Sequence, residues 1–255
     1  MSFQRYVALG DSFTEGVGDI DPTRPNGVRG WADRVAAVLA RNNPDFRYAN
    51  LAIRGRKLDP IIAEQVEPAL AMKPDLITIY AGANDIMRPK VDIEALGERY
   101  DAALGRLAGS GARLLVWTAF DPGDSALYRP LRGRFAIYNE FVRHSAARHG
   151  ADIVDYWWLR EYRNWDYWDP DRMHMGPVGH QRMAIEVLDV LGVDHDLTPL
   201  PLPSRPELSR AEQRRANATW TREHFVPWIG RRVTGRSSGD NLDPRWPTLA
   251  PVAPD

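Results

Sequence analysis

Residues 6 to 18 read YVALGDSFTEGVG, and the Gly10-Asp11-Ser12 turn within them could hold a phosphate, present a nucleophile or connect a strand to a helix. A phosphate loop needs a Lys followed by Ser or Thr after its second glycine, and a dinucleotide fingerprint needs G-x-G-x-x-G at the start of a helix. Neither spacing occurs in this turn. Two roles stay open for Ser12, that of a nucleophile and that of a helix N-cap, because serine is an ordinary N-cap residue.

Three further blocks of polar residues and glycines follow later apolar runs. They are NLAIRG ending at Gly55, GAND containing Asn84, and DRMH running from Asp171 to His174. Taken singly, each block is also explained as a turn or a helix cap, and the aspartates Asp11 and Asp85 are expected to be structural. The order and the positions of the blocks therefore carry more information than any one of them.

Taken together, the four blocks resemble the SGNH (GDSL-like) hydrolase family of lipases and esterases, over residues 5 to 192. The resemblance implies that Ser12, Gly55, Asn84 and His174 are functional residues. It assigns an oxyanion hole to the backbone N–H groups of Ser12 and Gly55 and to the side-chain amide of Asn84. It also implies a three-layer αβα sandwich around a five-stranded parallel, flavodoxin-like sheet. We expect no cofactor and no metal.

The chemistry of ester cleavage explains why these residue types are needed. A serine hydroxyl is a poor nucleophile at neutral pH, so His174 must take the proton of Ser12 while Asp171 orients the imidazole and stabilises its charged form. The three-residue spacing places Asp171 and His174 on one side of a turn. Each oxyanion donor stabilises the tetrahedral intermediate, and losing one typically costs on the order of 10²–10³ in rate.

A metal site is the alternative for the same segment. His174, His180, Asp169 and Asp171 carry imidazole and carboxylate groups, which suit several divalent ions. No H-E-x-x-H or similar spacing is present, and His180 falls well inside a predicted helix. The hydrolase interpretation is therefore preferred.

The elements that must position these residues alternate between short apolar runs and segments of helical period. Parallel sheets covered on both faces have this pattern, and they bind ligands beyond the carboxyl ends of their strands. The predicted strands are residues 5–9, 46–51, 76–80, 112–118 and 151–155, and the predicted helices are residues 31–41, 61–72, 93–108, 135–149 and 179–191.

Composition narrows the class of protein. The chain has 255 residues, a net charge of −1 and no cysteine, which excludes disulfides, thiolate catalysis and Cys-ligated zinc. The balanced charge argues against a nucleic-acid footprint over the whole protein. No stretch resembles a signal peptide or a membrane span, so we expect a cytoplasmic protein without a membrane span.

The chain is divided into a catalytic domain, residues 1–194, and a C-terminal extension, residues 195–255. Between residues 205 and 236 the extension carries eight arginines against three glutamates, and Ser209-x-x-Glu212 predicts the start of a helix. We expect the extension to pack its aromatic side chains on the domain or on a neighbouring subunit, the second option giving a homo-oligomer. Contact with nucleic acid is the less favoured alternative.

The expected function is that of a serine hydrolase for carboxylic esters, a short-chain acyl esterase or deacetylase that acts on a small-molecule ester through an acyl-enzyme. A thioesterase or lysophospholipase at the same site is the first alternative, and a non-catalytic glycan- or partner-binding module is the second. The sequence leaves the substrate-binding residues unassigned. Residues 156–168, YWWLREYRNWDYW, are either a pocket wall or a loop that anchors itself to the core.

Overall fold

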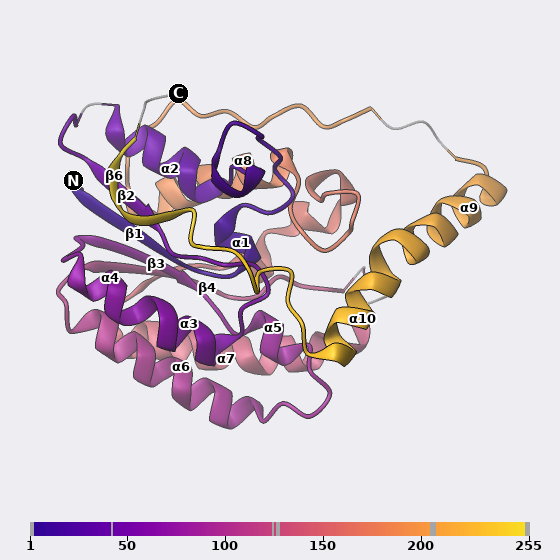
Figure 1. The fold of residues 1–255 in the computed structure, drawn as a ribbon, viewed down its shortest axis with the longest axis horizontal. Helices are drawn as coiled ribbons and strands as arrows, with labels where there is room; N and C mark the ends of the chain where they lie inside the picture. Colours follow the sequence, from indigo (N-terminus) through magenta and orange to yellow (C-terminus); the bar gives the residue numbers. More distant parts are fainter. Residues whose placement is uncertain (1–2, 42, 124, 126–127, 205–207, 253–255) are drawn as a thin grey trace.

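The computed structural model describes residues 3–41, 43–123, 125, 128–204 and 208–252, without the side chains of residues 232 and 233. All five predicted strands are present, and they pair in parallel in the order β5-β4-β3-β1-β2 (Figure 1). Their carboxyl ends therefore share one edge of the sheet, where the predicted site residues follow. The strands are β1 Arg5–Gly10, β2 Arg47–Asn50, β3 Leu76–Tyr80, β4 Arg113–Trp117 and β5 Asp152–Val154.

The predicted number of strands was one too low. A sixth strand, β6 (Trp246–Pro251), comes from the extension and pairs antiparallel with β2 at the edge of the sheet. Its two prolines, Pro247 and Pro251, are typical of a loop. They are tolerated here because an edge strand uses only one side of its backbone for pairing.

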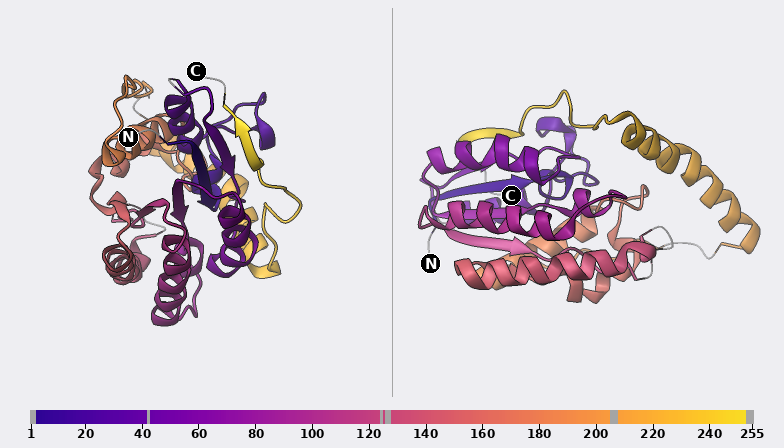
Figure 2. Two further views of the ribbon diagram at one scale, coloured as in Figure 1. Left: turned by 90° about the vertical axis from the view of Figure 1, so that its left-hand side faces the viewer. Right: turned by 90° about the horizontal axis from the view of Figure 1, so that it is seen from below.

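Helices cover both faces of the sheet, which confirms the αβα layers (Figures 1 and 2). One face carries α2 (Trp31–Ala40) and α8 (Pro177–Leu191). The other carries α6 (Ile93–Ala108), α7 (Arg132–His149) and a helix in three pieces, α3 (Leu58–Ile61), a π-helical turn (Ile62–Val66) and α4 (Glu67–Ala71). No helix in the described part of the chain is long and apolar enough to cross a membrane.

Strand β1 shows how the core holds the site. Tyr6 and Ala8 belong to the apolar cluster beneath α2 and α8, whereas Val7 and Leu9 belong to the cluster on the opposite face. A strand buried on both faces is apolar at every position, which is how this run reads in the sequence. The chain therefore leaves the sheet at Gly10 from a rigidly packed strand.

The extension forms an arm that stands away from the body before it returns to the sheet (Figures 1 and 2). The predicted capping box is confirmed, with Ser209 and Glu212 bonded reciprocally at the start of α9 (Arg210–Trp220). The helix continues through a π-helical turn (Thr221–Phe225) into α10 (Val226–Thr234).

A buried arginine ties the end of the extension to the body. The side chain of Arg245 is 0% exposed, and its guanidinium forms an ion pair of 2.6 Å with Asp33. It also donates to the backbone carbonyls of Glu15 at 2.9 Å and Pro25 at 3.0 Å. Because removing one partner of a buried ion pair typically costs about 3–5 kcal/mol, Arg245 holds β6 against the sheet.

Candidate active site

Ser12 begins the short helix α1 (Ser12–Glu15) directly after β1. The N-cap is Asp11 and not Ser12, because the Asp11 carboxylate accepts the backbone N–H of Phe13 at 3.0 Å. Ser12 is therefore left out of the cap, half-buried and facing a pocket. Burial raises the pKa of Asp11 to about 7, against the opposing effect of its hydrogen bonds.

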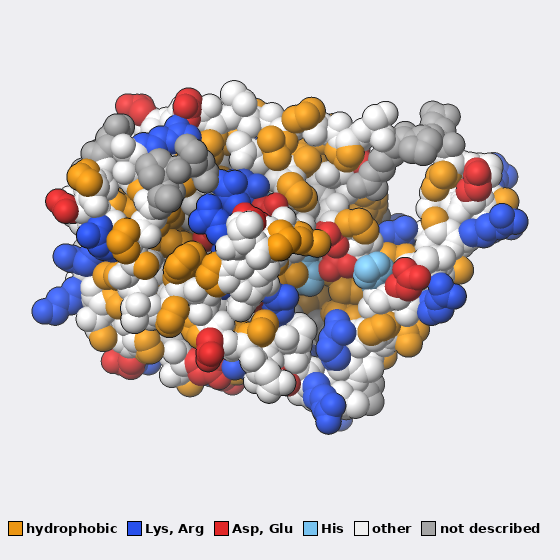
Figure 3. All heavy atoms as spheres, turned by 45° about the horizontal axis from the view of Figure 1, so that its top comes forward, with side chains coloured by type: hydrophobic (Ala, Val, Ile, Leu, Met, Phe, Trp, Pro, Cys, Tyr) orange, Lys and Arg blue, Asp and Glu red, His pale blue; other side chains and the backbone are white. Residues whose placement is uncertain are grey.

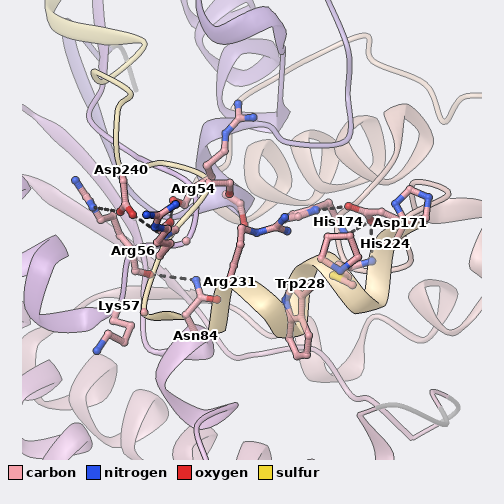
Figure 4. A pocket seen from close by; sticks show the side chains of 18 of the residues that line it. Arg54, Arg56, Lys57, Asn84, Asp171, His174, His224, Trp228, Arg231 and Asp240 are labelled. Atoms are coloured by element: carbon pink, nitrogen blue, oxygen red, sulfur yellow. Dashed lines mark hydrogen bonds and ion pairs between the residues drawn. The ribbon is translucent and has the colours of Figure 1, made fainter. Parts of the chain in front are cut away.

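Asp171 and His174 form the pair that their spacing predicts (Figure 4). His174 Nδ1 lies 2.6 Å from Asp171 Oδ2, and a carboxylate partner requires the proton on this nitrogen. The other carboxylate oxygen accepts the backbone N–H groups of Met173 at 2.8 Å and His174 at 3.0 Å, which fixes the turn.

The pair shifts the pKa of both of its members. Burial acts to lower the pKa of His174, but the hydrogen bond and the charge of Asp171 outweigh it and raise the pKa above its ordinary value. Burial acts in the opposite sense on Asp171, where the bond to His174 lowers the pKa of the carboxyl. His174 Nε2 is thus left as a base whose strength is increased by its partner.

Asn84 lies on the short helix α5 (Ala83–Ile86), next to Ser12 in the same pocket. Its side-chain amide donates to the Asp11 carboxylate at 2.8 Å and to the backbone carbonyl of Arg56 at 3.1 Å. Asp85, the next residue, accepts the backbone N–H of Leu58 at 2.9 Å and is structural, as expected.

Gly55 lies in the loop between β2 and α3, with a φ of +78°. A Cβ at this position would stand 2.2 Å from the hydroxyl oxygen of Ser237 in the extension. Glycine is needed here for its backbone conformation and for the close approach of the extension. Ser237 in turn donates to the carbonyl of Arg54 at 3.0 Å, so that the extension lies directly on this loop.

All five predicted site residues line one cavity of about 420 Å³. They are Ser12, Gly55, Asn84, Asp171 and His174. Figure 3 shows histidine and basic side chains together at the hollow where the arm meets the body. The structure thus brings the four sequence blocks to one place at the carboxyl edge of the sheet.

A smaller apolar cavity of about 100 Å³ adjoins the first, and the two share Ser12, Asn84 and His174. Its walls are rich in aromatic side chains, those of Phe13, Tyr80, Phe120, Tyr128, Tyr156, Trp168 and Trp228. Tyr156 and Trp168 belong to the aromatic segment 156–168. The hydroxyl of Tyr162 in the same segment is buried and donates to the carbonyl of Gly179 at 2.7 Å. The segment is therefore both a pocket wall and an anchor.

His180 is not brought to the site as a ligand. Its Nδ1 accepts the backbone N–H of Trp31 at 3.2 Å, and its Nε2 lies 3.2 Å from the carbonyl of Val17. Burial lowers the pKa of His180 to about 4. Among the described residues, no group of three His, Cys, Asp or Glu side chains could hold a metal ion. His180 thus bridges α8 and the α1–α2 region in its neutral form.

The model of the GDSL-like lipase/acylhydrolase family matches residues 8–182, which is more than half of the chain. The chain belongs to this family. Membership makes it a carboxylic ester hydrolase and confirms the resemblance seen in the four sequence blocks. A comparison with curated proteins finds no match.

Solved structures share the fold of this GDSL-like hydrolase. LAE5, an α/β hydrolase enzyme from the metagenome of Lake Arreo, Spain, is 22% identical, with a TM-score of 0.61 over 75% of this chain and 96% of that one. Axe2, an acetylxylan esterase from Geobacillus stearothermophilus, is 20% identical, with a TM-score of 0.62 over 76% and 96% of the two chains. The acetyl xylan esterase AlAXEase is 17% identical, with a TM-score of 0.60 over 73% and 99%.

The GDSL-like hydrolase builds much of its larger cavity from residues that sequence reasoning left unassigned. The extension contributes His224, Trp228, Arg231, Arg236, Ser237 and Asp240 to the walls. The available signal is the mixture of tryptophan and arginine between residues 205 and 236, which predicts a packing surface or, less favoured, a nucleic-acid contact rather than a cavity wall. The basic residues around Gly55 in the RGRK sequence were a second signal.

Proposed function

We propose that this hydrolase cleaves short-chain acyl esters by a serine mechanism, with Ser12 as nucleophile, His174 as general base and Asp171 as the residue that orients His174. The observation that carries the proposal is the 2.6 Å bond between His174 and Asp171 beside a Ser12 hydroxyl that the helix cap does not use. These three groups are the set that acyl transfer through an acyl-enzyme requires.

In the proposed reaction, the Ser12 oxygen attacks the ester carbonyl carbon and His174 Nε2 takes the hydroxyl proton. The tetrahedral intermediate then expels the alcohol, which receives this proton from His174. Water, deprotonated by His174, then attacks the acyl-Ser12 ester. The second tetrahedral intermediate releases the carboxylic acid as the bond to the Ser12 oxygen breaks, and this oxygen takes the proton back from His174. Asp171 stays ionised throughout and stabilises the imidazolium.

The proposed oxyanion hole consists of the backbone N–H groups of Ser12 and Gly55 and the amide of Asn84. Both hydrogens of the Asn84 amide are engaged, with Asp11 and with the Arg56 carbonyl. An oxyanion therefore competes with the longer of these bonds, the one of 3.1 Å to Arg56. The exchange favours the transition state because an oxyanion accepts a stronger hydrogen bond than a neutral carbonyl does.

The two cavities meet at Ser12, so that each would hold one side of the ester bond. The apolar cavity of about 100 Å³ is suited to the acyl group, and the polar cavity of about 420 Å³ to the alcohol. A small aromatic-walled space favours acetyl to butyryl groups over the long chains of a lysophospholipid. Two of the structures with the same fold are acetylxylan esterases, which supports acetylated sugars as the first natural esters to assay.

An acyl-length series tests this assignment. With p-nitrophenyl esters from acetate to decanoate, kcat/KM should be highest at acetate to butyrate and fall steeply beyond. A maximum at octanoate or longer contradicts the short-chain assignment. Matched acetyl thioesters and acetylated sugars distinguish a thioesterase from a deacetylase of sugars.

A further inference from the structure

The cavity on the alcohol side of Ser12 carries an excess of basic side chains. Six of its lining residues are Lys or Arg, from the loop after β2, from α5 onward and from the extension: Arg54, Arg56, Lys57, Arg88, Arg231 and Arg236. Among the described residues, three carboxylates line the same cavity, those of Asp171, Glu223 and Asp240. The walls of this cavity therefore favour negative charge within it.

Each of the three carboxylates already has a nitrogen partner, a histidine in one case and an arginine in the other two. Asp171 is bonded to His174 at 2.6 Å, and Glu223 lies 3.2 Å from Arg222. Asp240 lies 3.6 Å from Arg56. In the described part of the chain, each acid that lines the cavity is therefore already held in one of these contacts.

Two of the basic residues are also committed to structural bonds. Arg54 forms an ion pair of 2.6 Å with Glu15, whose side chain is 0% exposed. Arg56 forms one of 2.9 Å with Glu64. Lys57, Arg231 and Arg236, by contrast, form no ion pair with any residue that the structure describes. Burial raises the pKa of the Asp85 carboxyl, and the charge of Lys57 opposes this effect only in part.

These three cations come from two distant parts of the chain and line one cavity. Lys57 stands two residues after Gly55, Arg231 lies on α10, and Arg236 follows the end of that helix. In Figure 4, Arg231 rises from α10 between Asn84 and His174. Single solvated cations are ordinary on a surface. Three that line one cavity next to Ser12 favour an anion within that cavity.

We propose that the natural substrate is an acyl ester whose alcohol part carries a carboxylate or a phosphate, held by Lys57, Arg231 and Arg236. This inference rests on the proposed function, since it places the alcohol in the larger cavity. The planar fork of an arginine binds carboxylate and phosphate oxygens in pairs, and the lysine adds a point charge. The anion binds without taking part in the acyl transfer.

Matched substrate pairs test the inference. Each pair has the same ester at the same position, with and without the anion. One pair is an acetylated methyl glucuronoside and the corresponding methyl glucoside, and the other is acetylglycerol phosphate and acetylglycerol. At low salt, kcat/KM should be at least about tenfold higher for the anionic member of one pair, and the preference should shrink as salt rises.

The variant Arg231→Gln with Arg236→Gln should bring the ratio of kcat/KM between anionic and neutral esters close to one. Arg214→Gln with Arg215→Gln is the matched control, because these arginines are exposed on α9 outside the cavity, and it should keep the wild-type ratio.

Ratios of one or less for both substrate pairs, or a preference that survives in the Arg231/Arg236 variant, overturn the inference and leave the esterase assignment intact. Failure to hydrolyse every ester, neutral ones included, overturns both. A preference within only one pair supports the inference and identifies the anion as carboxylate or phosphate.

Discussion

The indole N–H of Trp220, on the extension, donates a hydrogen bond of 2.9 Å to the backbone carbonyl of Asp171. The next residue, Arg172, holds the same helix, since its guanidinium lies 5.0 Å from the centre of the Trp220 ring and donates to Asn217 at 3.0 Å. On the other side of the cavity, Ser237 is bonded to the Arg54 carbonyl beside Gly55. The extension thus contacts both loops that carry proposed catalytic groups.

Trp220→Phe should lower kcat more than it raises KM. The change keeps an aromatic ring but removes the N–H that positions the Asp171 loop, and one such bond is worth about 0.5–1.5 kcal/mol, or roughly two- to tenfold in rate. Steady-state kinetics with p-nitrophenyl acetate measures the effect. Trp158→Phe is the control, because Trp158 is 58% exposed and lines neither cavity. Equal kinetics in the two variants would show that the extension does not position Asp171.

The pH dependence of kcat/KM should report the raised pKa of His174. The base acts only in its neutral form, so activity should rise with pH through a midpoint above 6.5. Asp171→Asn removes the charge that raises this pKa. The midpoint should then move to lower pH, while kcat falls by on the order of 10²–10⁴ because the imidazolium is no longer stabilised. A midpoint that stays in place in Asp171→Asn contradicts the pairing.

Phe120→Ala should allow the hydrolase to accept longer acyl chains. Phe120 lines the smaller cavity and packs edge-on against Trp168 with ring centres 5.1 Å apart, so that its removal opens space beyond the acyl site. We expect the ratio of kcat/KM for hexanoate to kcat/KM for acetate to rise at least about tenfold. The free energy of unfolding should fall by roughly 3–5 kcal/mol. Phe3→Ala, a loss of the same side chain from the remote core, should destabilise without changing the preference. An unchanged acyl profile in Phe120→Ala would exclude the smaller cavity as the acyl site.

Much of the fold could be predicted because it depends on local pattern. The strand at residues 76–80 and the helix at residues 93–108 have the predicted bounds, since an apolar run or an amphipathic period defines each of them. The helix start at Ser209 and Glu212 likewise depends on two residues three positions apart. The order of the four blocks predicted which residues would meet, because parallel strands end at a common edge.

The features that could not be predicted from the sequence depend on contacts between residues far apart in the chain. Pro247 and Pro251 make the β6 segment look like a loop in the sequence, and it forms a strand because it pairs with β2. Arg245 looks like one more surface arginine, yet Asp33, more than two hundred residues away, makes it a buried anchor. The cavity wall formed by Arg231 and Arg236 depends on the return path of the extension. No local sequence pattern predicts the path of the extension.

Covalent labelling of Ser12 tests the central claim most directly. The wild-type hydrolase should react with a fluorophosphonate probe and show the adduct on the peptide that contains Ser12, and Ser12→Ala should lose both the labelling and the turnover of p-nitrophenyl acetate. Unfolding temperatures within about 2 °C of each other would show that the variant is folded. Labelling or turnover that persists in folded Ser12→Ala would contradict the account.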